Sequence, residues 1–329
     1  MIKRLSFILI FLLLQQSLAA QSLVDTPLIT TSLSMNLAGK IDSITEWTLS
    51  VKVLEVGAAL RVNSDSGNTV ITVPDTSFTI LEERAWKFDK QGRLSSRILR
   101  STENKQGELK EAEADFLRYK NNRLLNTLSR KDGELVDSSL YIYAGGKISR
   151  IEHYDDKRKY NGRKQFFQNK DRVLSTISNK NAALELIDMT KLWYDEKKEL
   201  KEVTFHDENQ RWLKTHKLEF GSDSAGNKHV KIFEFAKPDT CTGMVSYLLN
   251  DAGNHLEDVN QDERGMVTSF KTSVFNDYNH CVGQTVFKGE KTEFTSTYQY
   301  DKHKNWTYRR IYRNGEPYLH IRRTIIYRN

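Results

Sequence analysis

WKFDKQGRL, at Trp86–Leu94, contains the pattern that decides the fold: an aromatic residue, a polar turn that begins with Asp, and an apolar residue that starts the next strand. The pattern returns as LWYDEKKEL at Leu192–Leu200, VTFHDENQRWL at Val203–Leu213 and YQYDKHKNW at Tyr298–Trp306. Such self-similarity indicates repeated supersecondary units that bury their apolar faces by packing on their neighbours. It predicts architecture and says little about chemistry.

Turn signals accompany the repeat along the whole chain. Clusters of Asp, Asn and Gly return roughly every 11 to 16 residues, as at Asp89–Gly92, Lys131–Gly133 and Arg313–Gly315. These residues tolerate the positive φ of tight hairpin turns. We therefore expect an all-β fold with few or no helices, an extended antiparallel β-meander of repeated hairpins whose sheet is open, curled or solenoid-like. Closure into a barrel depends on register and shear, which turn positions do not determine.

The first residues are typical of a targeting segment. A basic start at Met1–Arg4 precedes an apolar run at Leu5–Leu14 and then small residues, so residues 1–20 are interpreted as a signal peptide. The run is shorter than the about 20 residues of a spanning helix. We expect an exported protein (periplasmic, associated with the outer membrane, or secreted) whose mature chain has no transmembrane segment.

The mature chain is expected to form one continuous body without a linker. Residues 21–85 are interpreted as an N-terminal β segment that leads into the array, and residues 86–329 as the repeat array. Removing Lys3 and Arg4 with the signal lowers the formal charge from +7 to +5, a surplus that hints only weakly at an anionic partner. Cys241 and Cys281 are the two cysteines, and in an oxidising compartment they could form a disulfide or remain free thiols.

The repeat units, together with LAGKIDSITEWTL at Leu37–Leu49 and YQYDKHKNWTYRRIYRNG at Tyr298–Gly315, resemble those of exported bacterial proteins with YD/Rhs-type repeats, chiefly from Bacteroidota-like organisms. The resemblance extends from about Leu37 to Arg328 on a short, degenerate motif. It implies an extended antiparallel β array and carries no catalytic residues across. Most turns here depart from Tyr-Asp-x-x-Gly-Asn, which weakens any implied sugar-binding role.

The sequence assigns no catalytic, cofactor-binding or metal-binding residue. Gly221–Lys228 is interpreted as a turn, because Asn227 stands where a phosphate loop needs Lys. Asp258–Gly265 offers alternating oxygen ligands but lacks the Gly and Glu of an EF-hand, so a looser calcium turn and a plain turn remain as alternatives.

The C-terminal part is rich in Arg and aromatic residues. Alternation from Trp306 to Tyr312 is expected to place the aromatic residues on one face of a strand. Cations beside aromatic faces suit an anionic glycan or a single-stranded nucleic acid, whereas Arg on a terminal edge strand also discourages aggregation. The possible ligand surface comprises Trp306, Tyr308, Arg310, Tyr312 and Arg322.

These observations predict a non-enzymatic exported binding or structural repeat protein of the cell envelope or secreted space. The expected partner is a glycan or an envelope protein, and export argues against nucleic acid. The alternative is a hydrolase acting on an envelope polysaccharide or peptidoglycan, with carboxylates supplied by separate repeats.

Overall fold

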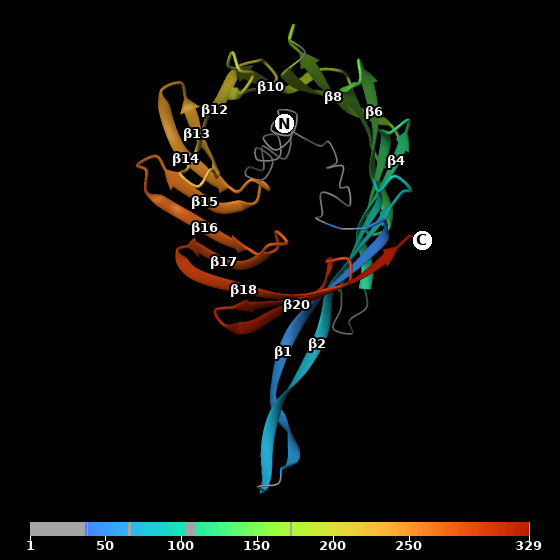
Figure 1. Cartoon of the computed structure of the whole chain (residues 1–329). Coiled ribbons are helices and arrows are strands. Elements are labelled where there is room, and N and C mark those ends of the chain that lie inside the picture. Colours follow the sequence, from blue (N-terminus) through green and yellow to red (C-terminus); the bar gives the residue numbers. More distant parts are fainter. Residues whose placement is uncertain (1–36, 38, 65–66, 103–108, 172, 329) are drawn as a thin grey trace. The chain divides into compact units, whose positions relative to one another are not determined.

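The fold is antiparallel β-sheet throughout the described part of the chain. The computed structural model describes residues 37, 39–64, 67–102, 109–171 and 173–328, with backbone alone for residues 50–79. Across those ranges the chain forms strands and turns and no helix (Figure 1). The all-β prediction is therefore confirmed, while the expected signal peptide at 1–20 lies outside the described residues.

Twenty strands follow one another in the part of the chain that the structure describes. Their bounds are β1 (Ile41–Ser64), β2 (Gly67–Phe88), β3 (Leu94–Thr102), β4 (Leu109–Lys120), β5 (Arg123–Lys131), β6 (Glu134–Ala144), β7 (Lys147–Tyr154), β8 (Tyr160–Gln168), β9 (Leu174–Asn181), β10 (Leu186–Tyr194), β11 (Leu200–His206), β12 (Trp212–Ser222), β13 (Lys228–Lys237), β14 (Thr240–Leu249), β15 (His255–Asp262), β16 (Val267–Phe275), β17 (Cys281–Lys288), β18 (Glu290–Tyr300), β19 (Trp306–Arg313) and β20 (Glu316–Tyr327). No helix among the described residues is long and apolar enough to cross a membrane.

The repeated motif forms a tight hairpin that its own Asp side chain caps. The Asp89 amide donates to the Arg93 carbonyl at 2.8 Å, and the Gly92 amide donates to the Asp89 carbonyl at 2.8 Å. Asp89 Oδ1 accepts from the amides of Gln91 and Arg93 at 2.9 and 3.0 Å. The same backbone hydrogen bond, from the amide of the Asp or Asn to the carbonyl of the fourth following residue, recurs at Asp155, Asn169, Asn181, Asp195, Asp207, Asp223, Asn250, Asp262, Asn276 and Asp301. The Asp or Asn of the motif is thus a turn residue, as the sequence predicted.

The fourth residue of this turn adopts the left-handed conformation. Gly92 has φ of 74°, and Lys198, Gln210 and Lys304 take φ of 61°, 61° and 65° at the equivalent position. A left-handed residue after a type I turn gives the three-residue hairpin loop with its bulge.

Most of these hairpins also carry a β-bulge just beyond the turn, and the hairpin at Asp223 is an exception. Phe88 pairs with Leu94 and Lys87 pairs with Ser96, which leaves Ser95 as an extra residue. The Ser95 hydroxyl donates to the Lys87 carbonyl at 3.1 Å. The extra residue reverses the alternation of side chains along the strand. The residue just before it and the residue just after it therefore lie on opposite faces of the sheet.

The sheet is closed, which corrects the expected open, curled or solenoid-like array. All strands belong to a single 20-stranded sheet. β1 pairs antiparallel with β2 and also with β20, from Ile41↔Tyr327 to Ser50↔Leu319. The first and last strands are therefore hydrogen-bonded neighbours, and β20 is no edge strand because β19 pairs with its other side. Turn positions could not reveal this pairing between the two ends of the chain.

The N-terminal part contains two long strands. β1 has 24 residues and β2 has 22. β1 and β2 pair from Ser43↔Lys87 to Ser64↔Gly67, whereas β20 covers β1 only as far as Ser50. Figure 1 shows β1 and β2 continuing as a two-stranded ribbon.

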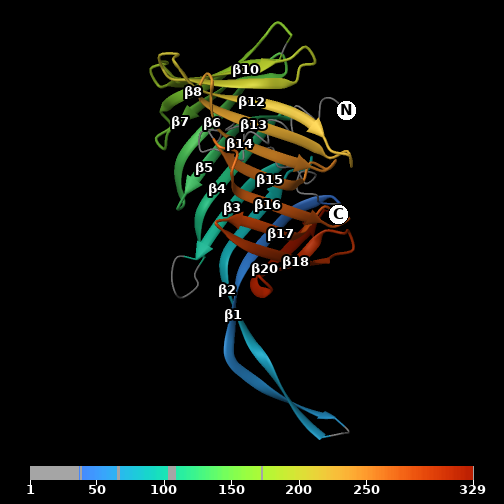
Figure 2. The same ribbon diagram turned by 90° about the vertical axis from the view of Figure 1, so that its left-hand side faces the viewer.

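The described residues fall into two compact units. One comprises residues 115–130 and 134–293, and the other comprises residues 37–114, 131–133 and 294–328. The expected boundary at residue 86 stays a prediction. In the first unit, strands β12–β17 lie side by side in sequence order (Figure 2).

Each unit has buried apolar side chains of its own. The core of the first unit includes Ile177, Val203 and Tyr247, which are 3%, 1% and 1% exposed. In the second unit Ile41 and Ile44 are 2% and 0% exposed. Burial of such side chains is the main favourable contribution to folding.

Candidate functional site

A pocket opens where two neighbouring strands of the first unit separate. The pairing of β10 with β9 runs from Leu186↔Lys180 to Lys191↔Thr176, and in the described residues it does not reach the end of β10. Beyond that point β10 pairs only with β11, and β9 only with β8. The separation leaves a pocket of about 290 Å³ between two Asx-capped turns.

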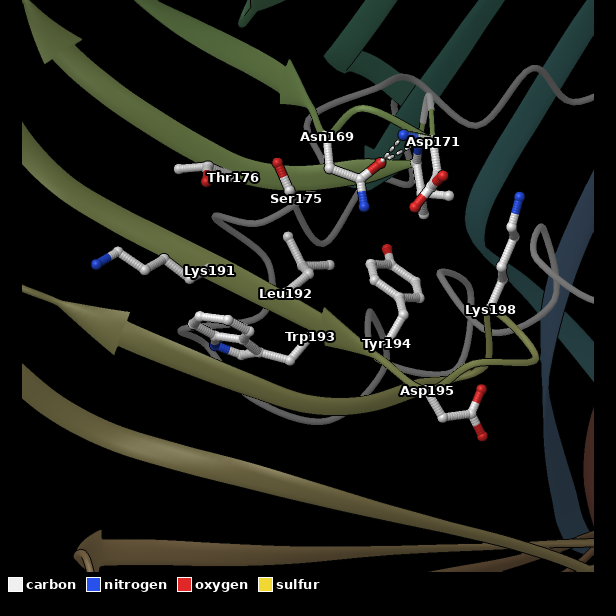
Figure 3. Close-up of a pocket in the computed structure, with 11 residues that line it drawn as sticks. Asn169, Asp171, Ser175, Thr176, Lys191, Leu192, Trp193, Tyr194, Asp195 and Lys198 are labelled. Atoms are coloured by element: carbon white, nitrogen blue, oxygen red, sulfur yellow. Dashed lines mark hydrogen bonds between the residues drawn. The ribbon is translucent and has the colours of Figure 1, made fainter.

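The pocket combines an exposed aromatic surface with polar groups (Figure 3). Trp193 is 57% exposed, the highest exposed fraction among the aromatic side chains on the described surface. Leu192 and Tyr194 are its neighbours on β10, and Ser175 and Thr176 line the pocket from β9. The lining comprises Asn169, Asp171, Val173, Ser175, Thr176, Lys191, Leu192, Trp193, Tyr194, Asp195 and Lys198.

The flanking turns hold the rim of the pocket in place. Asn169 Oδ1 accepts from the amides of Asp171 and Val173, each at 3.0 Å. Asp195 Oδ1 accepts from the Glu199 amide at 2.9 Å. This backbone hydrogen bond has the largest influence on the pKa of the Asp195 carboxyl, and it lowers that pKa. Asp195 is therefore ionised at neutral pH.

Tyr194 contributes a neutral phenol. Burial raises its pKa to about 12, so the hydroxyl keeps its proton and can both donate and accept a hydrogen bond. The pocket thus offers an indole surface, hydroxyls, carboxylates and the amines of Lys191 and Lys198. This mixture suits a polar ligand with one apolar face.

Four residues of the predicted ligand surface do lie together, in the second unit. Tyr308 pairs with Arg322, and Arg310 pairs with His320, so these side chains share one face of β19 and β20. Tyr312 is on the same face of β19. Arg310 and Arg322 are exposed.

Trp306 does not belong to that surface, which corrects the prediction that it shares a face with Tyr308. Tyr300 pairs with Trp306 and Gln299 pairs with Tyr308, so Thr307 is the extra residue of a bulge. The indole is 8% exposed, and the Arg323 guanidinium carbon lies 3.4 Å from its ring centroid. The bulge turns Trp306 to the buried side.

Asp258 lies in a strand and is engaged by cations of its own chain. The residue belongs to β15 and is 7% exposed. His255 Nδ1 lies 2.5 Å from its Oδ1, and Lys271 forms an ion pair with its Oδ2. Only the end of the Asp258–Gly265 stretch is a turn, in which Asp262 Oδ1 caps the amide of Arg264. No cluster of metal-ligating side chains occurs in the ranges that the structure describes.

Cys241 and Cys281 form no disulfide with each other in this structure. Cys241 lies at the start of β14 and Cys281 at the start of β17. Because successive strands of the ladder alternate in direction, these two starts lie at opposite ends of it. A disulfide requires Cα atoms within about 7 Å.

Sequence reasoning missed Trp193 and the pocket around it. Trp193 was visible within LWYDEKKEL, but its neighbours Leu192 and Tyr194 carry the same aromatic and apolar signal. The separation of β9 from β10 has no counterpart in the repeat pattern. The pocket forms because the hydrogen-bonded pairing of β9 with β10 ends before the end of β10. Only the strand register shows this.

Comparison with known proteins gives distant structural likeness only. No family model matches the chain, and no curated protein matches its sequence. A porin-like protein from Bacteroides uniformis is 10% identical with a TM-score of 0.35, over 88% of this chain and 98% of that one. A porin-like protein from Bacteroides vulgatus is 10% identical with a TM-score of 0.19, over 88% and 98% of the two chains. The TcdB2-TccC3-Cdc42 structure is 12% identical with a TM-score of 0.27, over 79% of this chain and 18% of that one.

The resemblance to YD/Rhs-type repeat proteins is overturned. The resemblance implied an extended array, whereas β1 and β20 pair and close the sheet. No family model supports the repeat assignment either. The shared motif reflects the geometry of an Asx-capped hairpin, which any antiparallel sheet can use.

Proposed function

We propose that the protein is a non-enzymatic, exported binding protein of the cell envelope or secreted space, and that its pocket at Trp193 takes a saccharide. The observation that carries the proposal is the exposed indole at the edge of a polar pocket. A sugar ring has one face of C–H groups and a rim of hydroxyls. The indole matches the face, and Ser175, Thr176 and Asp171 match the rim.

The pocket is suited to one sugar unit of a longer chain. Its volume of about 290 Å³ is near the lower limit of the about 300–1,000 Å³ found for small-molecule sites. Tyr194 and Trp193 add apolar area with few rotatable bonds, which limits the entropy lost on binding. The chemistry therefore favours a polymer that lies across the pocket.

The side chains of the pocket suit the binding of a saccharide better than the hydrolysis of a glycosidic bond. Glycoside hydrolysis needs one carboxylic acid whose pKa is raised, so that it can protonate the leaving group. The Glu199 amide instead lowers the pKa of Asp195. Asp195 is thus unsuited to act as the general acid at neutral pH.

A glycan array probed with the mature chain tests the proposal, followed by titration of the best saccharide against W193A. We expect saturable binding that W193A weakens by about tenfold, equivalent to about 1.4 kcal/mol. The matched control is Y278A, because Tyr278 is another exposed aromatic residue, 45% exposed, in the turn before β17. Equal affinity of W193A and Y278A, or no saturable saccharide, would overturn the proposal. Release of reducing ends that D171N abolishes would establish a hydrolase instead.

A further inference from the structure

A second polar surface lies on β18, β19 and β20 of the other unit. Across these strands Gln299, Tyr308 and Arg322 pair in one row. Thr297, Arg310 and His320 pair in the next row. We call the surface formed by Thr297, Gln299, Tyr308, Arg310, Tyr312 and Arg322 the Arg face.

Neither guanidinium group of the Arg face has a carboxylate partner within the described ranges. Arg310 lies over the Tyr308 ring, 5.4 Å from its centroid, and hydrogen bonds to the phenols of Tyr308 and Tyr312 raise its pKa. No carboxylate among the residues that the structure describes forms an ion pair with Arg310 or Arg322. Both side chains are exposed.

Arginine residues on the opposite face of the same strands are used differently. Arg323 pairs with Glu46, with 2.7 Å between Nε and Oε2. Arg309 donates to the Ser296 hydroxyl at 3.0 Å from one of its terminal nitrogens. The fold thus provides a carboxylate for Arg323, whereas Arg310 has only the phenols of Tyr308 and Tyr312 as hydrogen-bond partners and no described carboxylate pairs with Arg322.

The positive charges of Arg310 and Arg322 lie close together, which is electrostatically unfavourable when no anion lies between them. Arg310 pairs with His320, two residues from Arg322, so the two arginines are diagonal neighbours about 7–8 Å apart on one face. Burial and then the charge of Arg310 lower the pKa of His320. Like charges at this spacing repel each other, and an anion between them would remove the repulsion.

Protection of an edge strand does not account for these arginines. Cations on an exposed edge discourage pairing with other chains. β20, however, pairs on one side with β19 and on the other with β1. The charges stand on the face of a fully paired strand.

We infer that the Arg face binds the acidic groups of an anionic polysaccharide. Guanidinium groups bind carboxylate and sulfate oxygens in a bidentate geometry. Thr297 and Gln299 are exposed beside them and can hydrogen-bond to sugar hydroxyls. Apart from the rings of Tyr308 and Tyr312 its side chains are polar, so the surface offers little of the apolar area that a membrane-inserting surface buries. This site is separate from the pocket at Trp193 and does not depend on it.

Binding of the mature chain to polygalacturonate, measured by biolayer interferometry, tests the inference. Dextran serves as the neutral polysaccharide and phosphatidylglycerol vesicles as the anionic membrane. We expect binding to polygalacturonate alone, and a loss of at least about tenfold in R310Q/R322Q. The matched control is R211Q/R264Q, which removes the same charge from two exposed turn positions of the other unit. Near-ultraviolet circular dichroism verifies that each variant is folded.

Three outcomes would overturn the inference. Equal losses in the two double variants would show a general charge effect. Binding to the vesicles but not to polygalacturonate would show a membrane surface. Undiminished binding by R310Q/R322Q would place the site elsewhere. W193A is expected to bind polygalacturonate as the unmodified chain does, so this result is independent of the saccharide proposed for the pocket.

Discussion

Arg323 on β20 donates from Nε to Glu46 Oε2 on β1 at 2.7 Å, and the two side chains are 11% and 9% exposed. The residues are also a direct cross-strand pair. The guanidinium lies over the Trp306 ring on its other side. A buried ion pair of this kind ties the last strand to the first.

Removing Glu46 is expected to destabilise the protein strongly. E46A leaves the Arg323 charge buried without its partner, which costs about 3–5 kcal/mol. E46L/R323M, which removes both charges, should recover most of that loss. Urea denaturation of the mature chain measures the free energy of unfolding. A loss below about 1 kcal/mol in E46A would contradict a buried, structurally important pair.

His216 should make stability depend on pH in the acid range. Burial lowers its pKa from 6.5 to about 4, against the weaker opposing effect of Glu234. The unfolded chain therefore binds more protons than the folded chain between these values, so stability falls as the pH drops from about 6.5 to about 4. The loss approaches about 3 kcal/mol.

The variant H216F tests this expectation, because Phe keeps the ring packed edge-on against Phe205 and cannot be protonated. Urea denaturation at several pH values should show a flatter profile for H216F between pH 4 and 6.5. The control H229Q replaces a histidine on β13 and should keep the slope of the unmodified chain. A slope that H216F leaves unchanged would assign the pH dependence to other groups.

Gly162 is required by close backbone approach. A Cβ atom at this position would lie 2.2 Å from the Lys180 carbonyl oxygen, and φ is +143°. G162A is therefore expected to cost at least about 2 kcal/mol, through a clash with backbone and through strain. G221A is the matched control, since no atom lies within 4 Å of its added Cβ. Thermal unfolding compares the two variants, and similar midpoints would contradict the close contact between β8 and β9.

The Asx cap of the hairpins should be measurable at Asp207. Its Oδ1 accepts from the amides of Asn209 and Arg211 at 2.9 and 2.8 Å. D207A removes both hydrogen bonds and should lower the free energy of unfolding by about 1 kcal/mol. D207N keeps an acceptor oxygen and should lose less than half of that. Equal losses in the two variants would mean that charge, rather than the cap, is what Asp207 contributes.

Local features of this protein were predictable from sequence. The turn at Asp89–Gly92 was recognised because Asp and Gly meet the hydrogen-bonding and φ requirements of a tight turn within a few residues. The stretch Leu109–Ala114 belongs to β4 although it is rich in residues that favour helices. Sheet pairing with neighbours outweighs such propensities.

The candidate sites were predictable only in part. Tyr308, Arg310, Tyr312 and Arg322 lie on one face, because simple alternation holds along β19 beyond its bulge, and their role as a ligand surface stays a prediction. Trp306 was misplaced because the bulge at Thr307 reverses that alternation. The pocket at Trp193 escaped notice because it depends on where the pairing of β9 with β10 ends.

The sequence by itself determined the all-β class and the positions of the hairpin turns, because these depend on interactions between residues within about five positions of one another. Only the tertiary structure decided that the sheet closes, that the cysteines stay apart and that Arg310 and Arg322 face solvent without a carboxylate partner among the described residues. These properties depend on register and on contacts such as Glu46–Arg323, which are 277 residues apart in sequence. A local sequence pattern does not specify which distant strand pairs with β1.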